Sequence, residues 1–370
     1  MTDFTQMWVD STMVCDQRLE SLTGHVGSWS VMEGGAKKRM LHELETYEED
    51  PCGAGKSILV VEPYKGPLVK DCPGTRHHIC CGYKIINVVT NCPMDCSYCI
   101  LQGYLNNPCV TVHPQMDKIF EEVGACLDRH QGMYVRFGTG ELSDSLVIDN
   151  AVGFAREAVP FFARTMFGIL ELKTKAADVS HLLPLEHNGK TVVSWSLNPP
   201  AIVEKEELHT ATLTDRLRAA RACHDAGYAL GFHFDPLIYY AGWERDYRET
   251  VDLLFDFVSP ARIMWISLGG LRYPPALKNT ATARFPDTSI FTGEFVTGED
   301  GKYRYLKGIR IDMYRKVCSW LHEYDPSLFV YLCMERDDVW HEAFGWSPKH
   351  TGGLNRLFHE RIDHVLRGRP

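Results

Sequence analysis

From about residue 83 onward, short apolar segments alternate with longer amphipathic ones, and this alternation limits the fold more than any other feature of the chain. Each apolar segment is rich in β-branched or aromatic residues and is bounded by turn formers, as buried strands are. Six repeats of strand then helix predict a parallel sheet with helical crossovers. Because a closed barrel needs eight repeats, we expect an α/β fold of the partial, TIM-like (β/α)6 type, with its functional face at the carboxyl ends of the strands. The expected strands are 83–90, 134–138, 166–172, 191–198, 228–236 and 262–269, and the expected helices lie near 116–130, 144–158, 176–185, 211–226 and 245–257.

The regions that flank these repeats are less regular. We expect an N-terminal lead-in over residues 1–80, the partial barrel over 81–270 and a C-terminal α+β extension over 271–370. The lead-in carries no clear signal of a separate domain. Charged and aromatic residues alternate in the extension around a Gly-rich turn, which is typical of a β-hairpin on the substrate side. The elements expected there are this hairpin within 284–304, a helix near 309–324, an apolar strand at 328–334 and a tail.

Composition limits location and partners. The first ten residues contain neither a basic segment nor an apolar run, and no later stretch is apolar over the ~18 residues of a membrane span. We therefore expect a cytoplasmic protein. The net charge of -9 gives no general attraction to nucleic acid, so contact with phosphates requires a local basic patch. The 13 cysteines are many for a reducing compartment, where clustered thiols indicate metal or redox chemistry.

A glycine-rich segment at 52–57 has part of the pattern of a phosphate-binding loop. Asp50 stands where that loop requires its first glycine, and an apolar run at 58–61 follows where a helix should begin. We therefore reject a nucleotide-binding role for this segment.

Three cysteines, Cys92, Cys96 and Cys99, follow the first expected strand with the spacing C-x3-C-x2-C. Thiolates are soft ligands suited to iron–sulfur clusters, and a short loop can wrap three of them around one cubane. Three protein ligands leave one iron open to a small molecule. A zinc loop is the alternative, but zinc sites usually contain paired C-x2-C elements, and the sequence has no second pair. The spacing therefore predicts a [4Fe–4S] cluster.

This loop resembles that of the radical S-adenosylmethionine superfamily, in which an aromatic residue, here Tyr98, precedes the third cysteine. The resemblance implies that the amine and carboxylate of S-adenosylmethionine chelate the open iron. An electron from the reduced cluster then splits the sulfonium to a 5′-deoxyadenosyl radical. Tyr98 would lie beside the adenine. Residues 138–141 resemble the superfamily's small-small-Glu element, so Gly138 and Gly140 would let the backbone approach the ligand and Glu141 would receive its ammonium.

A collinear series of short matches between about residues 83 and 245 resembles one branch of the superfamily, the spore photoproduct lyases. This resemblance implies that Ser143, Lys175 and Ser196 hold the carboxylate of S-adenosylmethionine, and one cation with two hydroxyls suits that anion. It also implies repair of a thymine photolesion in DNA, with a flavodoxin- or ferredoxin-type electron donor. The matches include residues 99–102, 117–120, 136–137, 143–144, 174–175, 181–183, 188–191, 227–228, 230–232 and 242–245.

Two more residues are expected at ligand-facing strand ends. His233 and Asp235 share one face of the fifth expected strand, because alternate residues of a strand point the same way. Asn198 ends the fourth expected strand. We place Asn198 and His233 with the cofactor-binding residues, and a buried core histidine is the alternative for His233.

The resemblance fails at one informative position. Spore photoproduct lyases of bacilli carry a hydrogen-donating cysteine two residues before the matched serine, and here that position is Glu141. A carboxylate does not readily donate a hydrogen atom, so another group must complete such a reaction. Cys80, Cys81 and Tyr83 are the best-placed catalytic candidates by sequence, together with Tyr98. The alternatives are that the thiols, with Cys72, bind extra iron or are buried reduced thiols.

Three functions remain open at this point. The leading hypothesis is a radical lyase that repairs a thymine photolesion in damaged DNA. The second is a radical enzyme of the same lineage that acts on a small molecule, nucleotide or peptide, because the donor cysteine is missing and the chain is acidic. The third is an iron–sulfur protein without turnover. The sequence determines neither the oligomeric state nor whether S-adenosylmethionine is regenerated.

Overall fold

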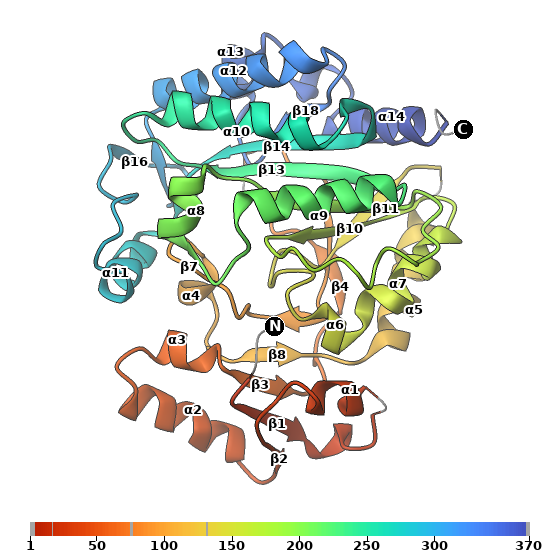
Figure 1. The fold of residues 1–370 in the computed structure, drawn as a ribbon, viewed down its shortest axis with the longest axis vertical. Helices are drawn as coiled ribbons and strands as arrows, with labels where there is room; N and C mark the ends of the chain where they lie inside the picture. Colours follow the sequence, from red (N-terminus) through yellow and green to blue (C-terminus); the bar gives the residue numbers. More distant parts are fainter. Residues whose placement is uncertain (1–3, 17, 75–76, 131, 368–370) are drawn as a thin grey trace.

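The described part of the chain contains two main sheets, of eight and five strands, besides two short ones, and the larger main sheet curls into a half-barrel (Figure 1). This computed structural model describes residues 4–16, 18–74, 77–130 and 132–367. The larger sheet has the strand order β4-β5-β9-β10-β11-β13-β14-β18, with all neighbours parallel except the antiparallel pair β4 and β5. The bounds are β4 Val69–Asp71, β5 Lys84–Ile86, β9 Val135–Gly138, β10 Gly168–Thr174, β11 Thr191–Ser196, β13 Ala229–Leu237, β14 Ile263–Gly270 and β18 Val330–Leu332.

Each of the six predicted strands contributes to this sheet, and the predicted fold class, a partial barrel, is confirmed. The strand predicted at 83–90 is two strands, of which β5 lies in this sheet and Val89–Thr90 pairs in the smaller one. All eight residues of β14 are buried, so a strand covered on both faces appears in the sequence as an unbroken apolar run. The expected number of six parallel strands is corrected to seven. The strand expected in the C-terminal extension, β18, pairs in parallel with β14, with Val330 opposite Ile266. The half-barrel therefore has seven parallel strands.

Helices connect these strands on the outer face of the sheet (Figure 1). The helices predicted near 116–130, 211–226 and 245–257 are present, and the one predicted at 144–158 is two helices. The helix predicted over 176–185 is wrong, because the chain there forms turns. The Asp178 carboxylate accepts the backbone N–H of Ser180 at 3.1 Å, and Pro184 has no N–H to donate. The bounds are α5 Met116–Arg129, α6 Asp149–Val152, α7 Phe154–Ala163, α8 Pro200–Glu206, α9 Leu213–Asp225 and α10 Trp243–Phe257.

The smaller sheet has the strand order β2-β1-β3-β8-β6 and lies below the half-barrel in Figure 1. Two of its strands, β6 and β8, come from the segment that also carries the three cysteines. The segment over 52–57 is a short helix followed by β3, which agrees with the rejection of a phosphate loop. The bounds are β1 Gln6–Asp10, β2 Trp29–Met32, β3 Ile58–Val61, β6 Val89–Thr90, β8 Val110–Val112, α1 Leu19–Thr23, α2 Ala36–Tyr47 and α3 Pro51–Gly55.

The C-terminal region contains the predicted hairpin, which is β16 paired antiparallel with β17, and β15 adds a third strand. The predicted helix near 309–324 is α12. No described helix is long and apolar enough to cross a membrane. The bounds are β15 Arg272–Tyr273, α11 Pro275–Arg284, β16 Phe295–Thr297, β17 Tyr303–Tyr305, α12 Lys307–Tyr324, α13 Asp337–Phe344 and α14 Leu354–Arg367.

Candidate active site

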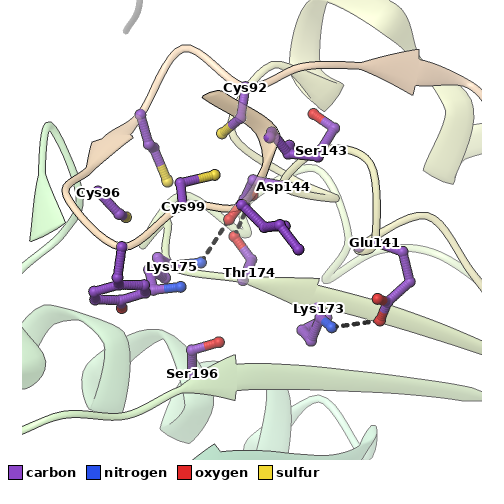
Figure 2. Close-up of a pocket in the computed structure, with 15 residues that line it drawn as sticks. Cys92, Cys96, Cys99, Glu141, Ser143, Asp144, Lys173, Thr174, Lys175 and Ser196 are labelled. Carbon is purple, nitrogen blue, oxygen red and sulfur yellow. Dashed lines mark hydrogen bonds and ion pairs between the residues drawn. The ribbon is translucent and has the colours of Figure 1, made fainter. Parts of the chain in front are cut away.

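Cys92, Cys96 and Cys99 line one pocket at the carboxyl ends of the barrel strands (Figure 2). Their loop runs from β6 to the short helix α4 (Leu101–Tyr104), and Cys92 and Cys96 are buried while Cys99 is half-buried. The space between the side chains is about 640 Å³, including part that is open to solvent. The other lining residues come mainly from the loop after β9 and from the ends of β10 and β11. The predicted position of the three thiols, at the functional face of the barrel, therefore agrees with the structure.

Two basic side chains hold the cysteine loop. The Lys56 Nζ atom donates to the backbone oxygens of Cys92 at 2.8 Å and Met94 at 2.7 Å. The Arg284 guanidinium donates to the Asp95 carboxylate at 2.8 Å. The sequence analysis missed both residues, although Lys56 lies in the segment that resembles a phosphate loop. The available signal for Lys56 was its position between a glycine-rich turn and an apolar strand.

The thiols fit a cluster in their chemistry and placement. Burial raises the pKa of Cys92 to about 12 and that of Cys96 further, so metal binding at these positions releases protons. Among the described residues, no three His, Cys, Asp or Glu side chains are placed to hold a single metal ion. A cubane holds its thiolate ligands farther apart than one ion does, so three thiols that line a common pocket suit a cluster better than zinc.

Ser143, Lys175 and Ser196, the predicted carboxylate ligands, line the same pocket (Figure 2). The Ser143 hydroxyl is buried and has no hydrogen-bond partner among the described residues. The Lys175 ammonium lies 5.7 Å from the centre of the Tyr98 ring and has no ion-pair partner among the described residues. Burial opposes its charge, but nearby Cys96 and Glu207 raise the pKa of Lys175. A half-buried cation and a buried, unpaired hydroxyl are partners that an anionic ligand needs.

Asp144 organises the backbone around this anion site. Its carboxylate accepts the Thr174 hydroxyl at 2.7 Å and the backbone N–H of Lys175 at 2.7 Å. It also accepts two N–H groups of its own loop, from Leu146 and Val147, each at 2.9 Å. The loop after β9 and the end of β10 are therefore fixed to each other, which sets the positions of the neighbouring serine and lysine.

Tyr98 lines the pocket, and a buried network behind it fixes its ring. Its hydroxyl donates to Glu207, which also pairs with Arg216 at 2.5 Å. Asn198 donates to Glu207 at 2.8 Å and accepts the Tyr247 hydroxyl at 2.7 Å. The pocket lining does not include Asn198, whose amide and carbonyl are both used within the protein. The structure therefore places Asn198 behind Tyr98, where it positions the ring rather than facing a ligand.

Glu141 lines the pocket but is already paired. Its carboxylate accepts from the Lys173 ammonium at 2.7 Å, and the two side chains remain 35% and 25% exposed (Figure 2). A methyl group on Gly140 would approach Lys173 within 2.8 Å, so a glycine at this position leaves room for the Lys173 side chain. Burial opposes the charge of Lys173, but Glu141 raises its pKa above the ordinary value. Sequence reasoning missed Lys173, although it shares a strand face with Lys175.

A second pocket adjoins the first, and Glu141 and Lys173 line both. Its space is about 770 Å³, including part that is open to solvent. The remaining lining comes from the segment between β4 and β5 and from β10, β13, β14 and β18 or the residues that follow them. The predicted catalytic candidates all lie here except Tyr98. The side chains with chemical functions are Cys72, Cys80, Cys81, Tyr83, Glu171, His233, Asp235, Ser267, Arg272, Tyr331 and Cys333.

His233 lies in this second pocket rather than beside the cysteine loop. Its ring nitrogens contact the Ser267 hydroxyl at 2.7 Å and the Glu171 carboxylate at 2.9 Å. Trp265 donates to the same carboxylate oxygen at 2.8 Å. Burial raises the pKa of Glu171, but His233, Lys173 and Arg136 together lower it to about 2. His233 therefore belongs to a buried network in the second pocket and does not line the pocket of the three cysteines, and its role toward the cofactor stays a prediction.

The hydroxyl of Tyr83 is buried in the second pocket and has no hydrogen-bond partner among the described residues. A methyl group on Gly138 would overlap this oxygen, so Gly138 leaves room for the phenol and does not line the cofactor pocket. Arg136 donates to the backbone oxygen of Cys81 at 2.6 Å. A hydrogen bond from Cys80 and the charge of Arg136 lower the pKa of Cys81 to about 5, although burial opposes this.

The fold and this site define a class: a partial (β/α) barrel with a three-cysteine loop and an anion site at its strand ends. A family model described as spore photoproduct lyase matches residues 79–317. The chain therefore belongs to the spore photoproduct lyase family. The family resemblance drawn from the collinear motifs is confirmed.

Curated relatives agree with this assignment. A spore photoproduct lyase of a Geobacillus strain is 35% identical over 254 residues, which cover 66% of this chain and 74% of the relative. The enzyme of Bacillus subtilis is 28% identical over 236 residues, or 62% of this chain and 68% of the relative. The alignment with the enzyme of Clostridium acetobutylicum, 26% identical, spans 60% of that protein.

Solved structures show the same fold. A spore photoproduct lyase complexed with dinucleoside spore photoproduct superposes with a TM-score of 0.78 at 23% identity, covering 90% of this chain and 99% of that chain. A mutant with bound AdoMet and dinucleoside spore photoproduct gives a TM-score of 0.76 at 23% identity, covering 89% and 99%.

Proposed function

We propose that this chain is a radical S-adenosylmethionine lyase that acts on a thymine photolesion in DNA. The observation that carries the proposal is the shared pocket of three thiols, one half-buried cation and an unpaired serine hydroxyl. Cys92, Cys96 and Cys99 would hold a [4Fe–4S] cluster. When bound, the cluster supplies the electron that splits the sulfonium of S-adenosylmethionine.

The residues of the pocket would bind and orient S-adenosylmethionine. Lys175, with the hydroxyls of Ser143 and Ser196, receives the carboxylate, because a half-buried cation is stabilised by an anionic partner. Tyr98 offers its ring to the adenine and is kept in place by its hydrogen bond to Glu207. Glu141 exchanges the Lys173 ammonium for that of the ligand. The Glu141–Lys173 ion pair lines the cysteine pocket and the second pocket alike. A ligand that binds Glu141 would therefore have its reaction centre facing the second pocket.

The substrate base would enter the second pocket. There Cys80, Cys81 and Tyr83 are the candidates for the hydrogen donor that the relatives place at the position of Glu141. Tyr83 has an unpaired hydroxyl, which leaves its O–H directed at no protein acceptor among the described residues. Donation breaks an O–H or S–H bond, forms a C–H bond on the product radical, and leaves the unpaired electron on the donor.

Support for a DNA substrate comes from the relatives, two of which are solved with dinucleoside spore photoproduct. The β16–β17 hairpin offers less charge than its sequence suggests. Arg304 donates to Asp300 at 2.8 Å, and Lys302 lies 3.6 Å from the same carboxylate. Because this carboxylate offsets part of the charge of the two cations, we expect DNA affinity that depends weakly on salt, since few phosphate contacts release few counterions. A cytoplasmic location and a flavodoxin- or ferredoxin-type reductant complete this proposal.

The deciding experiment incubates reduced, cluster-reconstituted protein with S-adenosylmethionine and an oligonucleotide that carries spore photoproduct. We expect thymine to be restored and the Lys175→Ala variant to lose both S-adenosylmethionine cleavage and repair. Formation of 5′-deoxyadenosine without restored thymine would reject the DNA substrate and favour a smaller substrate for the second pocket. Absence of both 5′-deoxyadenosine and restored thymine with wild-type protein would reject the radical mechanism itself.

A further inference from the structure

Asp235 is a strand-end carboxylate to which the proposed reaction gives no role. It follows His233 by two residues on β13 and lines the second pocket, where its side chain is 20% exposed. Its two oxygens accept hydrogen bonds from the Arg272 guanidinium at 2.9 and 3.1 Å. An ionised carboxylate has about four lone-pair positions, and these bonds occupy one on each oxygen. Asp235 can therefore accept a further hydrogen bond from a molecule in the pocket.

Two neighbours fix this carboxylate in place. Arg272 contacts both of its oxygens, and a methyl group on Gly269 would come within 2.6 Å of Asp235 Oδ1, so a glycine at this position leaves room for the ion pair. Burial opposes the charge of Asp235, but Arg272 and Lys173 hold the pKa of its carboxyl below the ordinary value. Asp235 is thus an ionised acceptor whose orientation is set before a ligand arrives, which lowers the cost of binding.

Lys173 supplies a donor beside this acceptor. It lines the same pocket, and Glu141 accepts one of the three N–H donors of its ammonium at 2.7 Å (Figure 2). Burial opposes the charge of Lys173, but Glu141 and, more weakly, Asp235 raise its pKa, so Lys173 and Asp235 are within electrostatic reach of each other. One ligand in the pocket can therefore meet a fixed acceptor and a cationic donor.

The polar network of the same pocket offers less to a ligand. His233 contacts the Ser267 hydroxyl at 2.7 Å and the Glu171 carboxylate at 2.9 Å, so these side chains are used within the protein. A network of mutually satisfied groups mainly makes a site rigid. Hydrogen bonding to a substrate therefore falls to side chains with remaining capacity, and Asp235 and Lys173 are such a pair.

We propose that Asp235 and Lys173 recognise the imide edge of a thymine ring of the lesion. This edge has an N3–H donor between two carbonyl oxygens, and enzymes that act on a base read such edges by hydrogen bonds. Asp235 accepts the N3–H, Lys173 donates to a carbonyl oxygen beside it, and Arg272 positions the carboxylate. The inference rests on the proposed function, because it specifies which base the second pocket takes.

The same arrangement excludes the other pyrimidine of DNA. Cytosine carries a lone pair at N3 and an amino group at C4, so it would turn a lone pair toward Asp235 and a donor toward Lys173. Two acceptors or two donors that face each other both stay unpaired, which costs affinity. The second pocket should therefore select thymine-derived rings by hydrogen bonding and not by size alone.

A matched pair of ligands tests the proposal. Cluster-reconstituted but unreduced protein is titrated calorimetrically, with S-adenosylmethionine present, with dinucleoside spore photoproduct and with its analogue methylated at N3 of both rings. A hydrogen bond to a charged group corresponds to about ten- to a hundredfold in affinity, so wild-type protein should bind the analogue more weakly by that factor. Asp235→Ala should weaken binding of the parent ligand and make the two affinities nearly equal. Asp235→Asn keeps an acceptor oxygen and should retain part of the difference.

Controls separate recognition from folding. Asp225→Ala removes an exposed ion pair with Arg221 outside both pockets and should keep the wild-type ratio of the two affinities. Equal affinities in wild-type protein would overturn the proposal, and this result does not depend on any variant. An unchanged ratio in Asp235→Ala, with circular dichroism like that of wild type, would also overturn it. Tight binding with equal affinities leaves the proposed function intact, whereas no binding of the parent ligand would reject that function and this inference together.

Discussion

Lys56 links the N-terminal sheet to the cysteine loop, and its removal should loosen the cluster before it unfolds the protein. The side chain is 11% exposed, and its ammonium donates to the carbonyl oxygens of Cys92 and Met94 at 2.8 and 2.7 Å. Asp95 lies 3.6 Å away and adds an ion pair. Lys56→Met keeps most of the buried stem and removes all three interactions.

The magnitude follows from the two hydrogen bonds. A hydrogen bond that involves a charged group contributes about 1.5–3 kcal/mol. Water reaches the freed carbonyl oxygens in part, so we take the lower end for each and expect a loss of about 3 kcal/mol. Each 1.36 kcal/mol is a factor of ten, so the loop should open on the order of a hundredfold more often. Iron release through that opening should accelerate by a similar factor.

The assay follows the loss of cluster absorption after a strong iron chelator is added to anaerobic protein. Lys37→Met is the matched control, because Lys37 pairs with Glu62 in the same N-terminal region but does not touch the loop. The control should release iron at the wild-type rate. Equal release rates for Lys56→Met and wild type, with a lower unfolding free energy for the variant, would refute the reasoning. In that case Lys56 would stabilise the N-terminal sheet and not the cysteine loop.

Three further substitutions have outcomes that the structure sets. Ser143→Ala should leave the melting temperature unchanged, because the Ser143 hydroxyl has no hydrogen-bond partner among the described residues. The substitution should weaken S-adenosylmethionine binding about tenfold in calorimetric titration, and an unchanged affinity would contradict the proposed role of Ser143. Gly138→Ala should destabilise the protein by about 3 kcal/mol in urea unfolding, since its methyl group overlaps the Tyr83 hydroxyl and comes within 2.6 Å of the backbone oxygen of Glu171. Tyr83→Phe in the same chain should restore part of this loss, and additive losses of the two substitutions would refute the contact. His233 is the main cause that lowers the pKa of Glu171 to about 2, against the effect of burial. The ionised carboxylate therefore stabilises the fold fully above its unfolded pKa near 4.5, and this contribution is lost as the pH falls toward 2. The gap in unfolding free energy between wild type and Glu171→Gln should therefore shrink by about 0.8 kcal/mol between pH 7 and pH 4, and a constant gap would contradict the shift.

The fold could be predicted where the signal is local. Strands that are buried on both faces, such as β14, appear as apolar runs without any knowledge of their neighbours. Two features depend on contacts that the pattern does not contain. The chain at 176–185 has apolar residues at helical spacing, but Asp178 and Pro184 favour turns. The strand β18 could be found, whereas its pairing with β14 required tertiary structure, since α12 and the hairpin separate them in the sequence.

The candidate site divides in the same way. Residues that belong to a spaced motif, such as Cys92, Cys96 and Cys99, could be identified because their spacing carries the chemistry. Residues that act through distant contacts, such as Lys56 and Arg284, could not, because a single basic residue has no pattern of its own. The pocket that His233 lines could not be predicted for a related reason. Alternation along a strand sets the side of the sheet, but not which of two adjoining pockets the side chain enters.

The strand β10 accounts for why two pockets adjoin at this point. Glu171 and Lys173 share one face of this strand, Lys175 follows directly after its last residue, and each of the three serves a different part of the site. Lys175 faces the anion site, Glu171 joins the His233 network, and Lys173 lies between them on Glu141. An ion pair in this position is costly to remove from one side only, because a single unpaired charge would then remain between the pockets. A ligand ammonium that takes Glu141 must therefore leave Lys173 to the carboxylates of the second pocket, Glu171 and Asp235, which already contribute to its raised pKa. The replacement of a donor thiol by Glu141 thus fits a site in which cofactor binding and the charge of the second pocket change together.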